Sequence, residues 1–186
     1  MRRAPGDPWE GLAPALKAHY RDGASVERGL LTIEFPRAMR PFLWGLRLLG
    51  ALVHHAGRDV PTQVEKDCMG ERECWHRTLS YPDGRVLRFD SVRVPAGEGR
   101  LIEFVNPLLG LELAPRIVGS QMHYQGVRFV LRLARFDMSI PPWLALGTAS
   151  IVERAIDDRR FFIDFRLRHP LLGQWFRYSG VFEAEP

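Results

Sequence analysis

Hydrophobic positions follow a helical period in two short segments near the start of the chain and a strand period through most of the remainder. Residues 9–20 place an apolar side chain at every fourth position, which predicts a short helix that ends at Asp22-Gly23. Residues 25–35 are rich in β-branched and apolar side chains and predict a strand that ends before Pro36.

Residues 41–56 predict a second helix, with a proline in the first turn and Gly57 directly after the last. Apolar side chains cover nearly its whole circumference, which is typical of a helix that is buried or that lies over an opening as a lid. His54 and His55 are expected near its carboxyl end. The segment contains Arg47 and is shorter than the about 20 apolar residues that a membrane span needs, so we expect no stable membrane insertion.

From Val60 onward, short segments of alternating apolar and polar residues are separated by turn signals. Such spacing is typical of an antiparallel meander, sandwich or barrel and not of βαβ units. We therefore expect a mainly β (α+β) fold: a curved antiparallel sheet or barrel-like meander of about nine to ten strands, with an N-terminal helix and a second helix after the first strand. The strands expected after the second helix are residues 60–69, 72–80, 85–94, 101–105, 111–124, 127–138, 147–156, 160–168 and 174–183.

Some of these strands carry charged residues among the apolar residues of one face. Arg77 shares a face with Trp75 and Leu79, and Glu103 lies between Leu101 and Val105 on another. A charge on an apolar face is costly unless it is paired or hydrated. One interpretation is a sheet that curls around a polar or hydrated cavity. The other is an edge strand, or a different register.

Composition limits the class of protein. The 186 residues, 46% hydrophobic and 26% charged, suit one globular domain over residues 1–186, with residues 1–8 expected to be flexible. The net charge of +4 comes from arginines interleaved with acidic residues, and nucleic-acid binding needs concentrated charge, so no nucleic-acid partner is expected. No secretory signal pattern is visible, which favours the cytoplasm and reduced cysteines.

Several short motifs in a fixed order resemble a known family. They are residues 16–19 (Leu-Lys-Ala-His), 73–77 (Glu-Cys-Trp-His-Arg), 101–104 (Leu-Ile-Glu-Phe) with 109–110 (Leu-Gly), 140–142 (Ile-Pro-Pro), 170–173 (Pro-Leu-Leu-Gly) and 178–180 (Tyr-Ser-Gly). Through them the chain, over roughly residues 12–183, resembles a bacterial domain of unknown function, number 4166 among such families. The chain departs from the family at Asn106, where glycine is usual, so the local turn is uncertain.

The resemblance implies no established activity. Members occur alone or joined to reductase-like domains that resemble saccharopine dehydrogenase, which implies a reductase-like partner and an accessory role beside a redox enzyme. The chain itself has no Gly-x-Gly-x-x-Gly after a strand, and we expect no cofactor.

Four residues are the first candidates for a ligand site: Trp75, Arg77, Glu103 and Tyr178. Arg77 and Glu103 are expected to form an ion pair on inward faces, while Trp75 and Tyr178 line a pocket and offer one polar tip each. In a binding role, Arg77 would hold a carboxylate or phosphate through bidentate hydrogen bonds. The structural alternative is a buried pair that only closes the sheet.

Other chemistry has weaker support. The six histidines lack zinc spacing, and although His76 and His123 could meet across strands, no motif indicates it and no metal site is predicted. Cys68 and Cys74 flank a hairpin turn, where a three-residue loop would bring them face to face; we expect two packed thiols. No nucleophile elbow is present, and Asp157-Asp158 is expected to be a turn, so the enzyme reading is not favoured.

The sequence therefore favours a cytoplasmic module that binds a small, mostly apolar or amphipathic ligand in a partly polar cavity. Two alternatives stay open at this point. One is an accessory domain or an enzyme that acts with a reductase partner, and the other is a protein–protein interaction domain.

Overall fold

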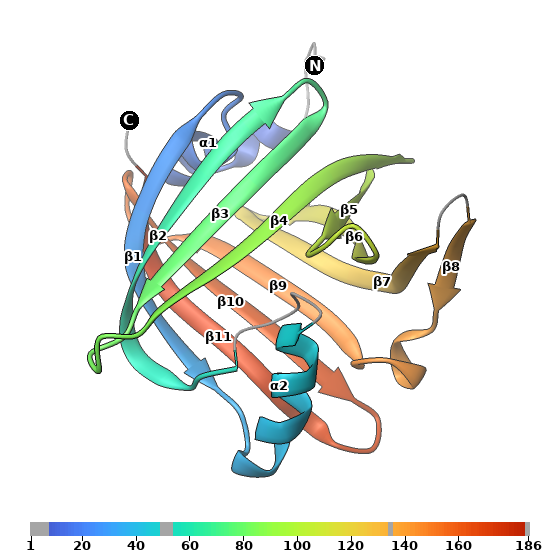
Figure 1. Cartoon of the computed structure of the whole chain (residues 1–186). Helices are drawn as coiled ribbons and strands as arrows, with labels where there is room; N and C mark the ends of the chain where they lie inside the picture. The colour runs from blue at the N-terminus through green and yellow to red at the C-terminus, as the bar shows by residue number, and fades with distance from the viewer. Residues whose placement is uncertain (1–7, 49–53, 134–135, 185–186) are drawn as a thin grey trace.

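The computed structural model describes residues 8–48, 54–133 and 136–184, and Figure 1 shows strands that wrap around a common interior. The short helical elements are η1 (Pro8–Gly11), α1 (Pro14–His19), η2 (Arg37–Met39), α2 (Arg40–Leu48) and η3 (Pro142–Leu144). The strands are β1 (Ser25–Glu34), β2 (Gly57–Met69), β3 (Arg72–Ser80), β4 (Val86–Gly97), β5 (Arg100–Phe104), β6 (Leu109–Val118), β7 (Gln121–Leu133), β8 (Phe136–Ile140), β9 (Thr148–Ala155), β10 (Arg160–His169) and β11 (Gly173–Ala184).

Ten of the strands form a closed antiparallel barrel, and β8 is an additional strand at its side. The order is β6-β5-β4-β3-β2-β1-β11-β10-β9-β7, and pairing between β6 and β7 closes the ring. β7 is long enough to have two partners on its other side: Met122–Gln125 pairs with β9, and Phe129–Leu133 pairs with β8. The mainly β, barrel-like meander expected from the sequence is thus confirmed.

The two ends of the barrel are covered by different elements (Figure 1). α1 packs against β9, β10 and β11 and carries three buried side chains, those of Ala15, Leu16 and His19. At the other end, α2 buries Leu43 and turns Leu46 toward the interior. Each end therefore presents its own side chains to the space inside the barrel.

The first helix is shorter than predicted because Pro14 interrupts it. A proline lacks the N–H that a helix interior needs, so η1 ends before it and α1 begins at it. The strand expected over residues 25–35 is β1 and is confirmed.

The second helix was predicted over residues 41–56, but α2 ends at Leu48. Residues 49–53 lie outside the described ranges, and His54 and His55 are not helical, so the position predicted for these histidines is wrong. The expectation of a buried helix holds only in part. Leu43 is buried, whereas 59% of Trp44 is exposed. No helix in the described ranges is long and apolar enough to cross a membrane.

The predicted strand over residues 111–124 is in fact a hairpin. β6 and β7 meet at a turn where Gly119 has φ 62°, a left-handed conformation that glycine adopts without steric cost. Pro115 lies inside β6. Pairing of β6 with β5 ends at Leu113, so Pro115 has a strand neighbour on one side only and its missing N–H is tolerated.

The β2–β3 hairpin also corrects the expected geometry of the cysteines. Its turn places Met69 opposite Arg72, so Cys68 faces Glu73 and not Cys74. Successive side chains alternate between the two faces of a strand, and the two thiols therefore point to opposite sides. Both are free, and Cys68 is exposed instead of packed. Residues 1–7 of the segment expected to be flexible lie outside the described residues.

Candidate functional site in the barrel interior

The barrel interior contains two cavities that lie in series along its axis. The cavity nearer α1 has a volume of about 60 Å³, and the one nearer α2 has a volume of about 250 Å³. Phe89 and Tyr178 line both. We call them the polar cavity and the apolar cavity, after the side chains that surround each.

The apolar cavity is lined almost wholly by aliphatic and aromatic side chains. α2 contributes Leu46, and the loop after η3 contributes Ala145 and Leu146, so these elements cover its outer end. Glu103 is the charged residue in its wall, at the end that adjoins the polar cavity. The remaining lining residues are Phe89, Val105, Leu109, Gly110, Leu111, Leu113, Phe129, Ile140, Ile151, Phe165, Leu167 and Tyr178.

Strand alternation brings the charged side chains inward. Along β3, Trp75, Arg77 and Leu79 occupy one face and all line the polar cavity. In the sheet register Glu103 of β5 is directly opposite Arg93 of β4. The pattern of charges on an apolar face therefore marks the wall of a cavity, as the first of the two sequence interpretations required.

The guanidinium cluster, which we define as Arg77, Ser91, Arg93 and Glu103, lies between the two cavities. Arg77 donates from Nη2 to Glu103 Oε1 (3.1 Å) and from Nη1 to Ser91 Oγ (2.8 Å). Arg93 donates from Nε to Glu103 Oε2 (3.0 Å), and the Ser91 hydroxyl donates to Oε1 (2.6 Å). One carboxylate thus accepts from two guanidinium groups and a hydroxyl.

Electrostatics in this cluster favour the charged forms. Burial by itself would raise the pKa of Glu103, but Arg93, Arg77 and the hydrogen bond from Ser91 lower it to about 2. Burial likewise opposes the charge of Arg93, and the adjacent Glu103 carboxylate still raises the pKa of that guanidinium above its usual value. The cluster is therefore ionised across the physiological pH range.

Aromatic rings surround the charges. The guanidinium carbon of Arg93 lies 4.5 Å from the ring centroid of Trp75, and that of Arg77 lies 5.6 Å from it. The indole Nε1 of Trp75 is buried without a hydrogen-bond partner in the described part of the chain. Tyr178 stacks on Phe165 at 4.7 Å, and burial raises the pKa of its hydroxyl to about 12.

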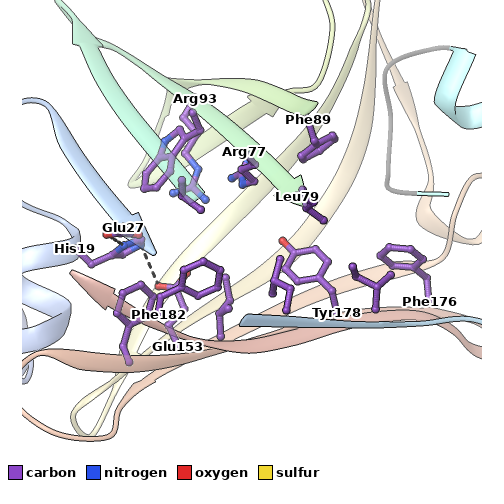
Figure 2. A pocket seen from close by; sticks show the side chains of 16 residues that line it. His19, Glu27, Arg77, Leu79, Phe89, Arg93, Glu153, Phe176, Tyr178 and Phe182 are labelled. Carbon is purple, nitrogen blue, oxygen red and sulfur yellow. Dashed lines mark hydrogen bonds and ion pairs between the residues drawn. The ribbon is translucent and has the colours of Figure 1, made fainter. Parts of the chain in front are cut away.

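A second set of charged side chains lies at the α1 end of the polar cavity, and we call His19, Glu27 and Glu153 the imidazole cluster. His19 Nδ1 lies 2.5 Å from Glu27 Oε1, and Nε2 lies 3.9 Å from Glu153 Oε2 (Figure 2). The hydroxyl of Tyr20 donates to Glu153. Burial raises the pKa of the Glu153 carboxyl, and His19 only partly offsets this.

Lys66 fixes α1 to the barrel. Its side chain is buried, and Nζ donates to the carbonyl oxygens of His19 (3.0 Å) and Arg21 (2.6 Å). The ammonium group thereby satisfies carbonyls at the end of a short helix. This contact sets the position from which His19 reaches the cavity.

A larger hollow, of about 770 Å³, lies between η1 and strands β3 to β7. Its lining combines exposed residues such as Gly97 and Arg100 with residues on inward strand faces such as Glu73, Arg93 and Leu101. Arg93 borders both this hollow and the polar cavity.

The two histidines considered for a metal site, His76 and His123, contact different partners. His76 lies on the outside of the barrel, 3.1 Å from Asp90, and His123 contacts Gln121. Within the described ranges, no group of three or more His, Cys, Asp or Glu side chains is arranged to hold a metal ion. Asp157 accepts from the backbone N–H groups of Arg159 and Arg160, as a turn residue does.

The four predicted site residues lie at the junction of the two cavities. Trp75 and Arg77 line the polar cavity, Glu103 lines the apolar one and Tyr178 lines both. Sequence reasoning missed the remaining polar and charged residues of the site, which are Ser91 and Arg93 of the guanidinium cluster and all of the imidazole cluster. The signal that indicated Arg77 and Glu103, a charged residue among the apolar residues of one strand face, was also present for two of the missed residues. Glu27 shares a strand face with Leu31 and Ile33, and Glu153 shares one with Ile151.

The local turn questioned at Asn106 is formed by the asparagine itself. Its Oδ1 accepts from the backbone N–H groups of Leu108 and Leu109, each at 2.7 Å. An asparagine side chain of this kind mimics a backbone turn. The departure from glycine therefore leaves the β5–β6 connection intact.

Comparison with known proteins gives one match. Residues 12–182 match the model of a family described as a domain of unknown function (DUF4166). No curated protein and no solved structure matches the chain.

Proposed function

The chain belongs to the DUF4166 family, whose description names no activity, and we propose that it binds a small amphipathic molecule inside the barrel. The apolar part of the ligand would occupy the apolar cavity, and a carboxylate or carbonyl end would reach the guanidinium cluster. Small-molecule pockets commonly combine an apolar wall with a few polar groups in fixed positions.

The observation that carries the proposal is the imbalance of charge in the guanidinium cluster. Two guanidinium groups, with side chains 15% and 8% exposed, share the single carboxylate of Glu103. A pair that served only to close the sheet would need one of them. Among the described residues, Arg93 donates a hydrogen bond only through Nε, so its terminal nitrogens are left to bind an oxygen of a ligand. Glu73, across the register from Arg93, adds a weaker attraction.

The dimensions limit the ligand. The apolar cavity, at about 250 Å³, is smaller than the roughly 300–1,000 Å³ of pockets that hold drug-sized molecules. The polar cavity, at about 60 Å³, holds a head group of only a few atoms. A medium-length hydrocarbon chain with one oxygen-bearing end matches both volumes.

A ligand would enter the apolar cavity from the α2 end. Its cover is thin there, since Leu46, Ala145 and Leu146 are only half-buried. Exposed apolar side chains surround this end, among them Trp44 and Trp143. A ligand that entered here would arrive with its apolar part last and its polar end directed at Arg77.

The test compares three probes of equal chain length: nonanoate, methyl heptyl ketone and nonanol, with binding measured by titration calorimetry. We expect nonanoate to bind most tightly. Arg77→Met keeps most of the apolar stem and leaves the Arg93–Glu103 pair intact, and it should weaken nonanoate binding by about 10-fold or more while it changes nonanol binding little.

Two controls make the result specific. Arg88→Met removes an exposed arginine on the outer face of β4 and should leave all three affinities unchanged. Leu111→Trp fills the apolar cavity and should abolish binding of every probe. Failure of all three probes to bind, together with no small molecule retained by the protein from its host in native mass spectrometry, would contradict the proposal. The reductase partner, the interaction role and the cytoplasmic location stay predictions from the sequence.

A further inference from the structure

The guanidinium cluster borders one end of the polar cavity, and the imidazole cluster at the other end has a different unsatisfied group. His19 and Glu27 are only 4% and 2% exposed, and Nδ1 of the imidazole contacts the Glu27 carboxylate. The opposite nitrogen, Nε2, is buried and has no hydrogen-bond partner within the described ranges. A buried histidine that served packing alone would have both nitrogens satisfied.

Glu27 determines which nitrogen of His19 carries the proton. A carboxylate at 2.5 Å accepts the N–H of Nδ1, so the neutral ring presents its lone pair on Nε2. His19 is one of the residues that line the polar cavity (Figure 2). A carboxylate that orients an imidazole with a free nitrogen is the usual arrangement of a general base.

The guanidinium groups that would hold a ligand oxygen border the same cavity. The ring of Trp75 contacts both clusters: its centroid is 5.3 Å from that of His19 and 4.5 Å from the guanidinium carbon of Arg93. His19, Arg77 and Arg93 all line this cavity of about 60 Å³, so a head group held there by an arginine shares a small space with His19. A base and anion-stabilising groups around one reacting centre are the parts that proton abstraction requires.

We propose that His19 is a general base that removes a proton from the carbon next to a carbonyl group of the bound ligand. This inference rests on the proposed binding function. The C–H bond breaks and its proton passes to Nε2, while its electron pair forms a C–C double bond and the carbonyl electrons move to the oxygen. The resulting enolate oxygen is held by the guanidinium N–H groups of Arg77 and Arg93.

The proton then returns from Nε2 to carbon, either to the same atom or, in an unsaturated chain, to a carbon further along. The first outcome is hydrogen exchange and the second is a double-bond isomerisation, and both balance without an oxidant, a reductant or a cofactor. A carboxylate would become a dianion in this step, so the substrate class is a neutral carbonyl compound with an apolar chain.

Glu27 is a positioning residue in this scheme, because it acts only through His19. Glu153 lies 3.9 Å from Nε2, and burial shifts the pKa of its carboxyl upward, which favours the neutral acid over a second carboxylate charge that would hold the proton on Nε2. Among the described residues, the charged and titratable groups around His19 include Tyr20 directly after α1, Glu27 on β1, Lys66 on β2, Arg93 on β4 and Glu153 on β9.

The experiment measures deuterium incorporation at the carbons beside the carbonyl of methyl heptyl ketone in heavy water, by NMR. Calorimetry first establishes that the ketone binds. We expect the protein to accelerate the exchange at least 100-fold over buffer, and His19→Gln to remove that acceleration. Glu27→Gln should reduce the rate about 10-fold and change the nitrogen-15 shifts of His19, which report its tautomer.

The outer surface provides a matched control. His76 and Asp90 form the same type of pair at 3.1 Å, with side chains 46% and 63% exposed, and His76→Gln should leave the exchange rate unchanged. A measurement on the unaltered protein keeps the proposal testable where His19→Gln does not fold. The nitrogen-15 spectrum must show neutral His19 with its proton on Nδ1, and a proton on Nε2 throughout pH 5–9 would overturn the base role.

The two proposals fail in different ways. Ketone that binds without faster exchange overturns the proton-transfer inference and leaves the binding function intact. No binding of any of the three probes contradicts the binding function first. Exchange that persists in His19→Gln assigns the base to another residue and also overturns the inference.

Discussion

The guanidinium cluster and the imidazole cluster border the polar cavity from opposite ends, and they differ in how the buried charge of each carboxylate is compensated. In the guanidinium cluster, Glu103 accepts from two arginines and a serine, and its pKa is lowered to about 2. In the imidazole cluster, one histidine lies between Glu27 and Glu153, and burial raises the pKa of Glu153. Burial by itself would raise the pKa of both Glu103 and Glu153. The ratio of cations to carboxylates around each therefore decides whether its pKa ends above or below the ordinary value.

The difference in charge compensation suits the two clusters to different proposed roles. A cluster that is ionised throughout the usual pH range gives a fixed positive end to the cavity, suited to hold an oxygen. A cluster with fewer cations than carboxylates retains a proton and a free imidazole nitrogen, suited to move one. The two proposals thus assign ligand binding and proton transfer to opposite ends of one small cavity.

The largest expected effect comes from removal of the Glu103 charge. Glu103→Gln leaves two largely buried guanidinium groups without a carboxylate, and breaking a buried pair in this way costs about 3–5 kcal/mol of the free energy of unfolding. Urea denaturation at pH 7 measures it. The matched control is Glu98→Gln, since Glu98 pairs with Arg100 at an 82% exposed site and should cost less than about 1 kcal/mol. Equal costs for the two variants would break the comparison.

Acid should weaken the guanidinium cluster next. The native pKa of Glu103 lies below its ordinary value of 4.5, so its stabilisation is fully present above about pH 4.5 and is lost as the pH falls toward about 2. The shift corresponds to a loss on the order of 3 kcal/mol. Because Asp164 and Glu112 also have lowered pKa values, the measurement is the difference between the wild type and Glu103→Gln over this range. A difference that does not change with pH would contradict the assignment.

Glu153 should respond in the opposite direction, with a smaller effect. Its native pKa is raised, so the folded state binds the proton more tightly than the unfolded state, and stability falls as the pH rises through the region above 4.5. Glu153→Gln imitates the neutral acid and should be more stable than the wild type at alkaline pH but not at pH 4. The effect is smaller than that of Glu103 because a protonated carboxyl avoids most of the burial cost. Urea denaturation at several pH values measures it.

The barrel could be predicted from the sequence because alternation and turn signals are local. The strand over residues 160–168 has Phe161, Ile163, Phe165 and Leu167 on one face and, apart from Phe162, charged residues on the other, and it was confirmed as β10. The prediction failed where a local signal had two meanings, as at Pro115, which is tolerated in β6 only because β5 has ended. That condition depends on strand pairing, which no single segment of the sequence determines.

The candidate site shows the same division. Arg77 and Glu103 were found because each lies among apolar neighbours of its own strand, and the ion pair between them forms at 3.1 Å. The role of His19 could not be found in this way, because it lies on a short helix and reaches its partners Glu27 and Glu153 only when the barrel closes beneath α1. Which charges meet, and in what ratio, is a property of the closed ring.

The smallest expected effect concerns a pair with the same chemistry in a different environment. Asp90→Asn removes the partner of His76 on the outer surface, where water hydrates both groups, and should change the free energy of unfolding by less than about 0.5 kcal/mol. The His19–Glu27 pair is also a histidine–carboxylate pair, with glutamate in place of aspartate, and it differs chiefly in burial, so a variant of Asp90 provides the exposed reference for the enclosed cavity. Urea denaturation of Asp90→Asn beside Glu27→Gln gives that contrast directly. If the surface variant lost as much stability as the buried one, the exclusion of water would not be what distinguishes the imidazole cluster, and the argument that its free nitrogen has a chemical role would lose its physical basis.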